Sequence, residues 1–413
     1  MIISAGARKL FIFAVILSQM FSPVLFVPGL EAVGLNIFRF LLILISAAIL
    51  ATGSYAISPE LRAPIKILFA LTGWMGISIA WTEDVASGIR HLSYILNIAL
   101  SIFALDFLLK AKKDFQFATK LLALSGLIAA TAGFYEIVTG NHFFDSSLQD
   151  AADLDRSLAY VTEGQAWFTF GNPNDLAVHV TVCALLAFWI LYRSGIYRIG
   201  AILLVCAAIY LSDALEARIV MGSILVFVTV YGILRFRTSP VLVATIGKVG
   251  LALGAIILLI GVAFADRAEF LDVSAFIRIQ LVLAGIQMAF STLFLGIGTG
   301  GFESEIWHAG FLGQTYGITN PHNAILRLFA ENGVVGLSLF VGLLAGPLTF
   351  VARSPRITHV ALVTTSFIVV LPLLLSAGSD PLTSSSLQLA MAMLWISCRF
   401  MRVDETKPLE KIA

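Results

Sequence analysis

Charged residues are scarce in this chain, and this scarcity excludes most soluble folds. Asp, Glu, Lys and Arg make up 12% of the 413 residues, about half the share of a typical soluble domain. The formal net charge is only +1, which excludes the strongly basic surface that nucleic-acid binding requires. Cysteine is rare as well. Cys183, Cys206 and Cys398 all lie in apolar runs, which favours small core residues over disulfides or metal ligands.

Apolar residues, in contrast, are abundant: they make up 59% of the chain. Runs near twenty residues recur, the length that an α-helix needs to cross a bilayer. The sequence therefore predicts an all-α integral membrane protein, with residues 1–413 as one polytopic domain of about twelve transmembrane helices. The candidate spans are 10–28, 34–53, 64–81, 91–109, 118–138, 174–193, 196–212, 218–234, 241–264, 330–351, 357–376 and 383–401.

The first apolar run, from Leu10 to Pro28, follows Arg8 and Lys9 and so has the beginning of a signal peptide. It has no clear small-residue cleavage site, and a second apolar run follows at once. We therefore expect it to be a retained helix rather than a cleaved leader.

Lysine and arginine are distributed unevenly between the two sets of loops. If the N-terminus is cytoplasmic, nineteen of the 26 basic residues fall on the cytoplasmic side. The positive-inside rule then predicts that both termini are cytoplasmic and that loops 139–173 and 265–329 are external. Within the second loop, residues 275–290 predict a helix that lies at the interface. The external side has only arginines: Arg39, Arg90, Arg156, Arg218, Arg267, Arg278 and Arg327.

The end of the second external loop has the pattern of a turn that leads into a helix. Pro321 disfavours a helical backbone at the residue before it, and Asn323 is a good N-cap. Asn323, Arg327 and Glu331 recur at a spacing of four and predict one polar stripe. His322 lies at the helix N-terminus, where the dipole disfavours imidazolium, and a neutral imidazole is what a general base must be. The alternative is a histidine that only caps a helix at the interface.

Two external arginines are candidates for binding a phosphate group. Arg218 opens a predicted span, and Arg278 lies on the predicted interfacial helix. A guanidinium binds phosphate or pyrophosphate through two parallel hydrogen bonds and stays charged when half-buried. Anchoring at the membrane surface is the ordinary alternative for any one arginine.

The glycines of segment 296–301 match the letters of a dinucleotide-binding fingerprint. That fingerprint requires a preceding strand, which an external loop of a helical membrane protein does not supply. We expect instead a tight turn at Gly298 and Gly300 that lets the backbone approach a ligand or a helix closely.

Two further sets of polar residues are candidates, one as metal ligands and one as polar groups within or at the edge of the membrane spans. Asp153 and Asp155, or Glu303 and Glu305 with His308, do not close a coordination set, so no metal is expected. Polar residues inside or at the edge of a span are functional candidates by default, although hydrogen bonding between helices is the preferred interpretation for His179. The residues of this kind are Asp175, His179 and Asp213.

The predicted topology restricts the chemistry. An external site has no nucleotide-sugars, so an activated glycan donor has to arrive on a lipid. Arginines at the membrane surface would hold the leaving pyrophosphate, and a histidine base would deprotonate the acceptor hydroxyl.

Several motifs of the chain resemble the O-antigen ligase and O-antigen polymerase-like family of bacterial polytopic membrane glycosyltransferases. The resemblance covers about residues 165–340 and includes FGNPNDLA at 170–177. In EARIVMGSIL, Ala217 stands where the family's motif has serine before Arg218. The late motif is the more specific one and consists of Gly296, Gly298 and Phe302, then His322 and Asn323, then Glu331, Gly333 and Gly336.

The resemblance implies metal-independent and cofactor-free glycosyl transfer at the external face of the bacterial inner membrane. The donor would be an undecaprenyl-pyrophosphate-linked oligosaccharide and the acceptor a glycan, lipid or protein. His322 would be the base, with Arg218 and Arg278 on the pyrophosphate. Supporting residues would be Asn323, Arg327, Glu331, Gly298 and Gly300.

The exact role stays open at this point. Polymerase and ligase both fit, and other polysaccharide assembly proteins are partners that the resemblance allows. A flippase or transporter of lipid-linked glycan and a non-catalytic component of an export complex are the alternatives. A transporter is expected to have polar groups at the midplane and broken helices in matching halves, whereas this sequence concentrates its polar residues in one external loop.

Overall fold

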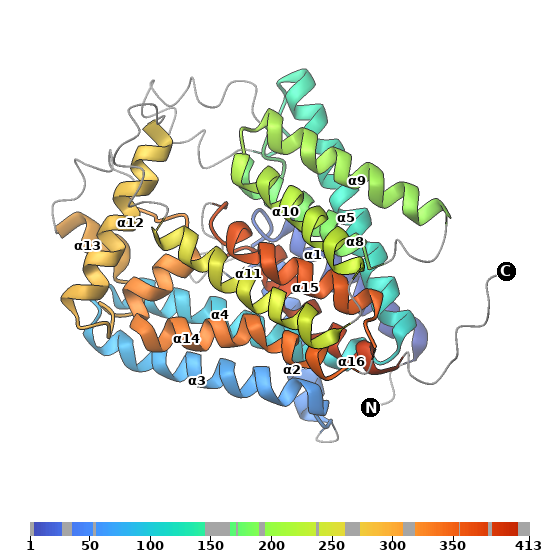
Figure 1. The fold of residues 1–413 in the computed structure, drawn as a ribbon, viewed down its shortest axis with the longest axis horizontal. Coiled ribbons are helices and arrows are strands. Elements are labelled where there is room, and N and C mark those ends of the chain that lie inside the picture. Colours follow the sequence, from blue (N-terminus) through green and yellow to red (C-terminus); the bar gives the residue numbers. More distant parts are fainter. Residues whose placement is uncertain are drawn as a thin grey trace.

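The chain is helical throughout the part that the structure describes. The structure is a computed structural model, and it describes residues 4–26, 35–52, 55–144, 166–170, 172–189, 195–236, 239–260, 273–308, 319–354, 356–378 and 382–403. In these residues there is no β-strand, only an isolated bridge between Phe26 and Asn36. The predicted all-α fold class is confirmed (Figure 1).

Each of the twelve predicted spans coincides with a helix. Among the described residues, six helical segments are long and apolar enough to cross a membrane, and the remaining apolar helices are shorter, so helix length does not confirm the predicted number of twelve crossings. The elements are α1 (Ala5–Phe21), α2 (Ile37–Ala51), η2 (Pro59–Leu61), α3 (Arg62–Ser78), η3 (Ile79–Trp81), α4 (Val85–Leu108), α5 (Lys112–Thr139), α8 (Pro173–Ala187), α9 (Gly195–Ala214), α10 (Arg218–Arg235), α11 (Pro240–Ile260), α12 (Val273–Ser291), α13 (Phe302–His308), α14 (Ala324–Arg353), α15 (His359–Leu374) and α16 (Ser385–Val403).

Short polar side chains determine where several helices begin. Asn36 caps α2 by accepting a hydrogen bond from the backbone N–H of Arg39 at 3.0 Å. Asn172 caps α8 in the same way, with Pro173 at the first helical position. Such caps satisfy backbone donors that have no partner inside the helix. These helix starts therefore follow from local sequence alone.

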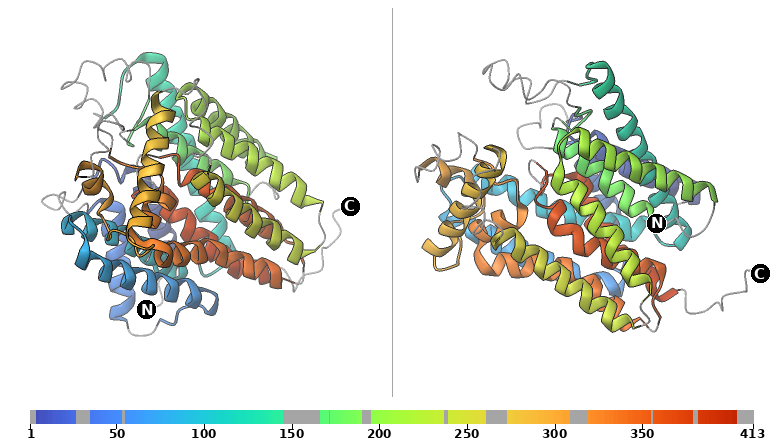
Figure 2. Two further views of the ribbon diagram at one scale, coloured as in Figure 1. Left: turned by 60° about the vertical axis from the view of Figure 1, so that its left-hand side comes forward. Right: turned by 45° about the horizontal axis from the view of Figure 1, so that its top comes forward.

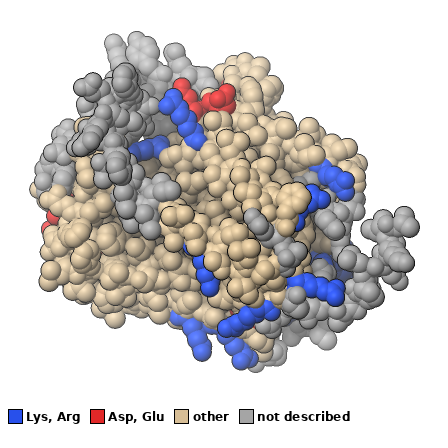
Figure 3. All heavy atoms as spheres, viewed as in Figure 1, with Lys and Arg blue, Asp and Glu red and all other residues tan. Residues whose placement is uncertain are grey.

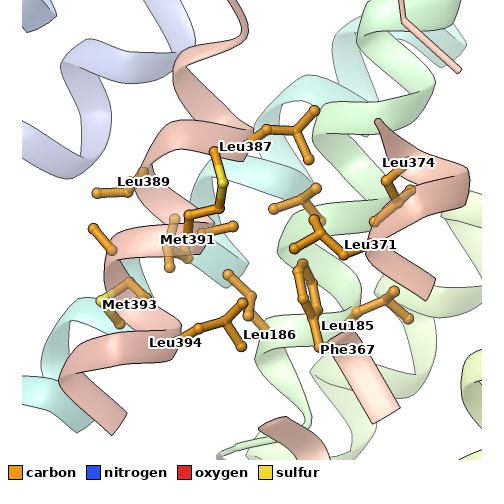
Figure 4. Packing of buried hydrophobic residues seen from close by; sticks show 14 of the residues in the cluster. Leu185, Leu186, Phe367, Leu371, Leu374, Leu387, Leu389, Met391, Met393 and Leu394 are labelled. Atoms are coloured by element: carbon orange, nitrogen blue, oxygen red, sulfur yellow. The ribbon is translucent and has the colours of Figure 1, made fainter. Parts of the chain in front are cut away.

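The centre of the molecule lies between α8, α15 and α16. Both α8 and α15 are buried along almost their whole length. Figure 4 shows Leu186 of α8, Phe367 and Leu371 of α15, and Leu387 and Met391 of α16 meeting in this core. Around it, α15 also packs against α10 and α11, α8 against α5 and α9, and α16 against α4.

The outer faces of the peripheral helices carry large apolar side chains. Ile196 on α9 is 76% exposed and Phe69 on α3 is 73% exposed. Exposed apolar patches of this extent suit contact with lipid rather than water. Cys206 also lies on the exposed surface of α9, so its prediction as a core residue was wrong. An apolar run does not separate the two cases, because apolar side chains of a membrane helix face the lipid as well as the protein core. Cys183 and Cys398 are buried, as predicted.

Several described residues assigned to the cytoplasmic side lie at the starts of α1 and α5 and the ends of α4 and α16, which meet at one end of the helix bundle. There Arg8 pairs with Asp114 at 3.3 Å, and Arg399 forms an ion pair with Asp106. Burial raises the pKa of Tyr55 to about 12, so its hydroxyl stays protonated and donates to Asp106. Figure 3 shows Lys and Arg mainly along the lower and right edges of a largely uncharged surface. Which side of the membrane this end faces stays a prediction.

The helix predicted over residues 275–290 is present as α12, and its position at the membrane interface stays a prediction. It packs against α14, which also contacts the short α13. Figures 1 and 2 show α12 and α13 together on one side of the molecule, beside α14. Helix α14 begins at Ala324, six residues before the predicted span 330–351. The first turns of the helix are polar, so hydropathy alone does not include them in the span, but other helices cover these polar side chains.

Candidate functional site

His322 lies in a strained backbone conformation just before α14. Its φ angle is +49°, in the left-handed region that residues with a Cβ seldom adopt. Asn320 holds this turn because its side-chain oxygen accepts a hydrogen bond from the backbone N–H of His322 at 2.9 Å. The imidazole is half-buried. Strain of this kind persists only where the surrounding structure imposes it, and it is concentrated at functional sites.

The next residue fixes the start of the helix. The Asn323 side-chain oxygen accepts from the backbone N–H groups of Ile325 and Leu326, both at 3.0 Å. The backbone N–H of Ala324 donates to the carbonyl of Leu375 after α15. Asn323 is thus the N-cap of α14, as predicted.

A buried ionic cluster anchors the first two turns of α14. The Arg327 guanidinium donates to Glu303 of α13 at 2.6 Å and to His91 of α4 at 3.1 Å. One Glu331 oxygen lies 4.0 Å from Arg327 Nε, and the other lies 3.5 Å from His91 Nδ1. The predicted polar stripe is real, and it faces other helices rather than solvent.

The contact with Arg327 determines which nitrogen of His91 accepts a hydrogen bond. A guanidinium can only donate, so the facing Nε2 atom of His91 must accept. The other ring nitrogen, Nδ1, is directed at Glu331, 3.5 Å away. The cluster thus contains one guanidinium, one buried carboxylate and the half-exposed carboxylate of Glu303.

Removing the Arg327 charge should destabilise the protein strongly. Arg327→Met would leave the Glu331 carboxylate, which is 2% exposed, without its cation, and losing one partner of a buried pair costs about 3–5 kcal/mol. We expect the purified variant to unfold at a clearly lower temperature in detergent. Adding Glu331→Gln should recover part of the loss. The exposed Arg62→Met is the matched control, and an equal melting temperature for Arg327→Met would contradict the prediction.

Helix α14 breaks at Gly333, whose backbone is not helical (φ +63°, ψ −161°). The break leaves the carbonyls of Ala330 and Glu331 without their usual helical donors. The glycine turn supplies replacements: Ile297 and Gly298 donate their backbone N–H groups to these two carbonyls, each at 2.9 Å. The helix break and the turn therefore form one hydrogen-bonded unit.

The glycine turn fits between helix backbones, as predicted for a close approach. Gly298 (φ +101°) and Gly300 (φ +82°) both have left-handed φ values. A Cβ on Gly298 would lie 2.8 Å from the backbone nitrogen of Thr82, and one on Gly300 would overlap the backbone of Gly88. Between them, Thr299 donates to the side chain of Asn332 at 2.7 Å. Of the two predicted alternatives, a ligand or a helix, the described contacts of the turn are with the backbone at the end of η3 and in the first turn of α4.

The two predicted phosphate-binding arginines lie on other helices. Arg218 is the first residue of α10 and is exposed, while Arg278 is half-buried in the second turn of α12. Because α12 packs on α14 through Gly285 and Leu326, Arg278 belongs to the same group of helices as His322. That Arg218, Arg278 and His322 form one site stays a prediction.

Two members of the cluster were not recognised from the sequence in this role. His91 begins a predicted span, and the rule that intramembrane ionisable groups are functional candidates would have selected it. Glu303 was considered only as a metal ligand. Among the described residues, no three His, Cys, Asp or Glu side chains are grouped so that they could hold a metal ion. Asp153 and Asp155 lie outside the described residues.

Comparison with known proteins agrees with the resemblance inferred from the sequence. Residues 178–341 match a family model described as O-Antigen ligase. The matched segment begins in α8 and ends in α14, so it contains Arg218, Arg278, the glycine turn, His322 and the buried cluster residues of α13 and α14. No curated protein matches the chain.

Proposed function

From the match of residues 178–341 to the O-antigen ligase family model, we propose that this membrane protein polymerises or ligates cell-envelope polysaccharide. It transfers a glycan from undecaprenyl pyrophosphate to an acceptor hydroxyl at the external face of the bacterial inner membrane. His322 is the general base, and Arg218 and Arg278 bind the pyrophosphate. The sugar, the linkage and the acceptor class are not part of this proposal.

The conformation of His322 is the observation that carries the proposal. A half-buried imidazole with φ +49° is held by Asn320 on one side and by the Asn323 cap on the other. Backbone strain of this kind is concentrated at functional sites, which favours a catalytic role over simple helix capping. The buried ion cluster below it keeps the first turns of α14 rigid, and rigid support is what a positioned base requires.

The proposed reaction is a single displacement at the anomeric carbon. The neutral imidazole of His322 takes the proton of the acceptor hydroxyl while the hydroxyl oxygen forms a bond to the anomeric carbon. The bond from that carbon to the pyrophosphate oxygen breaks, and undecaprenyl pyrophosphate leaves with the electron pair. The guanidinium groups of Arg218 and Arg278 stabilise the negative charge that develops on the leaving group.

An assay with purified protein tests the arginine roles. We expect Arg218→Lys and Arg278→Lys each to lower kcat/KM for release of undecaprenyl pyrophosphate about tenfold or more, because lysine keeps the charge but loses the paired hydrogen bonds. The substrate is the lipid-linked oligosaccharide purified from the host. Arg62→Lys, on the opposite end of α3 from the glycine turn, is the control and should be unaffected.

The same preparation separates the transferase from the flippase. Reconstituted into vesicles, a flippase would move the lipid-linked glycan between leaflets without releasing pyrophosphate. Translocation without release, or full activity in both lysine variants, would overturn the proposal.

A further inference from the structure

A polar pocket of about 540 Å³ lies between helix ends that no proposed role uses. Its volume is within the range of pockets that hold drug-sized ligands. The lining comes from the end of α1, the starts of α2, α8 and α16, and the second and third turns of α4. It includes two of the external arginines, Arg39 and Arg90, but not Arg218, Arg278 or His322.

The floor of the pocket is rigid because its polar groups are joined in a closed ring. Ser386 donates to the Gln19 side-chain oxygen at 2.9 Å, and the Gln19 amide donates to Ser125 at 3.3 Å. His179 completes the ring with hydrogen bonds to Ser125 and Ser386. Four helices are joined in this way, which confirms that His179 forms hydrogen bonds between helices. Satisfied polar networks of this kind hold a site in one shape.

The walls combine the groups that recognise sugars. Hydroxyls and amides are suited to hydrogen bonding with sugar hydroxyls, and aromatic rings offer flat apolar faces to sugar rings. The hydroxyl and amide residues are Gln19, Ser22, Asn36, Thr383, Ser384, Ser385 and Ser386, and the aromatic ones are Phe26, Tyr94 and Phe170.

The charge of the lining favours an acidic ligand. Arg39 is almost fully buried, with its guanidinium 4.8 Å from the centre of the Tyr94 ring. Arg90 is exposed on the same wall, one turn before Tyr94 on α4. Among the described residues of the lining, Asp175 is the one acidic residue. Over the described lining, two guanidinium groups stand against one carboxylate, and a carboxylate-bearing sugar is complementary to that excess of positive charge.

The pocket adjoins the α14 segment on two sides. On α4, Tyr94 lies in the pocket wall, and its ring is 5.6 Å from that of His91, which contacts Arg327. On the other side, Asp175 lies close to Gly378, three residues after Leu375, whose carbonyl accepts from Ala324. The pocket and His322 thus share one end of the bundle, a few side chains apart.

We propose that this pocket is a second binding subsite, which holds a short segment of acidic glycan with its carboxylate toward Arg39 and Arg90. The subsite would keep one sugar chain in place while its end is presented near the start of α14. That use rests on the proposed glycosyl transfer, whereas binding itself does not.

Direct binding of free sugars tests the subsite. Fragments of two to four sugars from the host's surface polysaccharide are separated into acidic and neutral pools and added to the purified protein in nanodiscs. Saturation-transfer NMR should detect the acidic pool. We expect Arg90→Gln to weaken binding about tenfold and Ser384→Trp, which fills the half-exposed wall, to abolish it. Glu305→Gln, on α13 and outside the pocket, is the control and should bind as the wild type does.

The outcomes separate this inference from the proposed reaction. His322→Ala should bind the acidic pool normally even if transfer stops, so the subsite survives failure of the catalytic role. Binding that is unaffected by Ser384→Trp places the sugar elsewhere and overturns the inference. Equal binding of the neutral pool, or displacement by millimolar inorganic phosphate, would show a different ligand chemistry and also overturns it.

Discussion

Replacing His322 with alanine should stop synthesis of the surface polymer in the native host. Loss of a positioned general base costs roughly 10²- to 10⁴-fold in rate. The half-buried imidazole lies outside α14, so the variant should reach normal levels in the membrane. We expect lipid-pyrophosphate repeat units to accumulate on the external face of the inner membrane. The measurement combines polymer analysis of the cell surface with quantification of lipid-linked intermediates on each face.

His308→Ala is the matched control. His308 is on the neighbouring α13, and its exposed side chain contacts the exposed Glu83 at 2.9 Å and Ser304 at 3.4 Å, so its removal should leave polymer unchanged. Intermediates on the inner face would instead indicate a flippase. Unchanged polymer in His322→Ala would remove the catalytic role and favour a structural component of an export complex.

Replacing Gly333 with alanine should prevent the protein from folding normally. At φ +63° and ψ −161° the backbone is accessible essentially to glycine alone. A Cβ there would overlap the carbonyl oxygen of Phe294, which accepts from the backbone N–H of Val334 at 2.9 Å. Neither backbone group can move without losing that bond, so we expect destabilisation of about 4 kcal/mol or more. Membrane levels and the melting temperature in detergent measure it.

A second glycine of α14 offers the control. Gly342 has helical neighbours, and a Cβ there would meet nothing within 4 Å. Gly342→Ala should therefore be neutral or stabilising by roughly 0.5–1 kcal/mol. If Gly333→Ala and Gly342→Ala melt at the same temperature, the helix break is not required for stability.

The parts of the fold that could be predicted depend on local signals. Apolar runs located the helices, Asn323 was identified as a cap from its position before an apolar stripe, and a tight turn was expected at Gly298 and Gly300. All three are properties of a few consecutive residues. The spacing of Asn323, Arg327 and Glu331 also gave one face correctly, because helical periodicity needs no knowledge of the partner.

The parts that could not be predicted depend on contacts between distant segments. One partner of Arg327 is His91, separated from it by 236 residues. The polar pocket is assembled from parts of five helices, and the spacing within any one of them does not show that the others lie beside it. Likewise, Cys206 and Cys183 lie in equally apolar runs, yet one faces outward and the other the core. Periodicity shows that a helix has faces, but it does not show which neighbour covers each face.

The hydrogen bonds at the α14 break have a consequence for the order of assembly during synthesis. The donors at Ile297 and Gly298 precede Gly333 by about thirty-five residues in the chain, so they emerge from the ribosome first. When α14 enters the bilayer, the donors that its two carbonyls need have already been synthesised. An unsatisfied carbonyl in lipid costs several kcal/mol. The glycine turn therefore has to pack against α14 no later than the insertion of α14 into the bilayer.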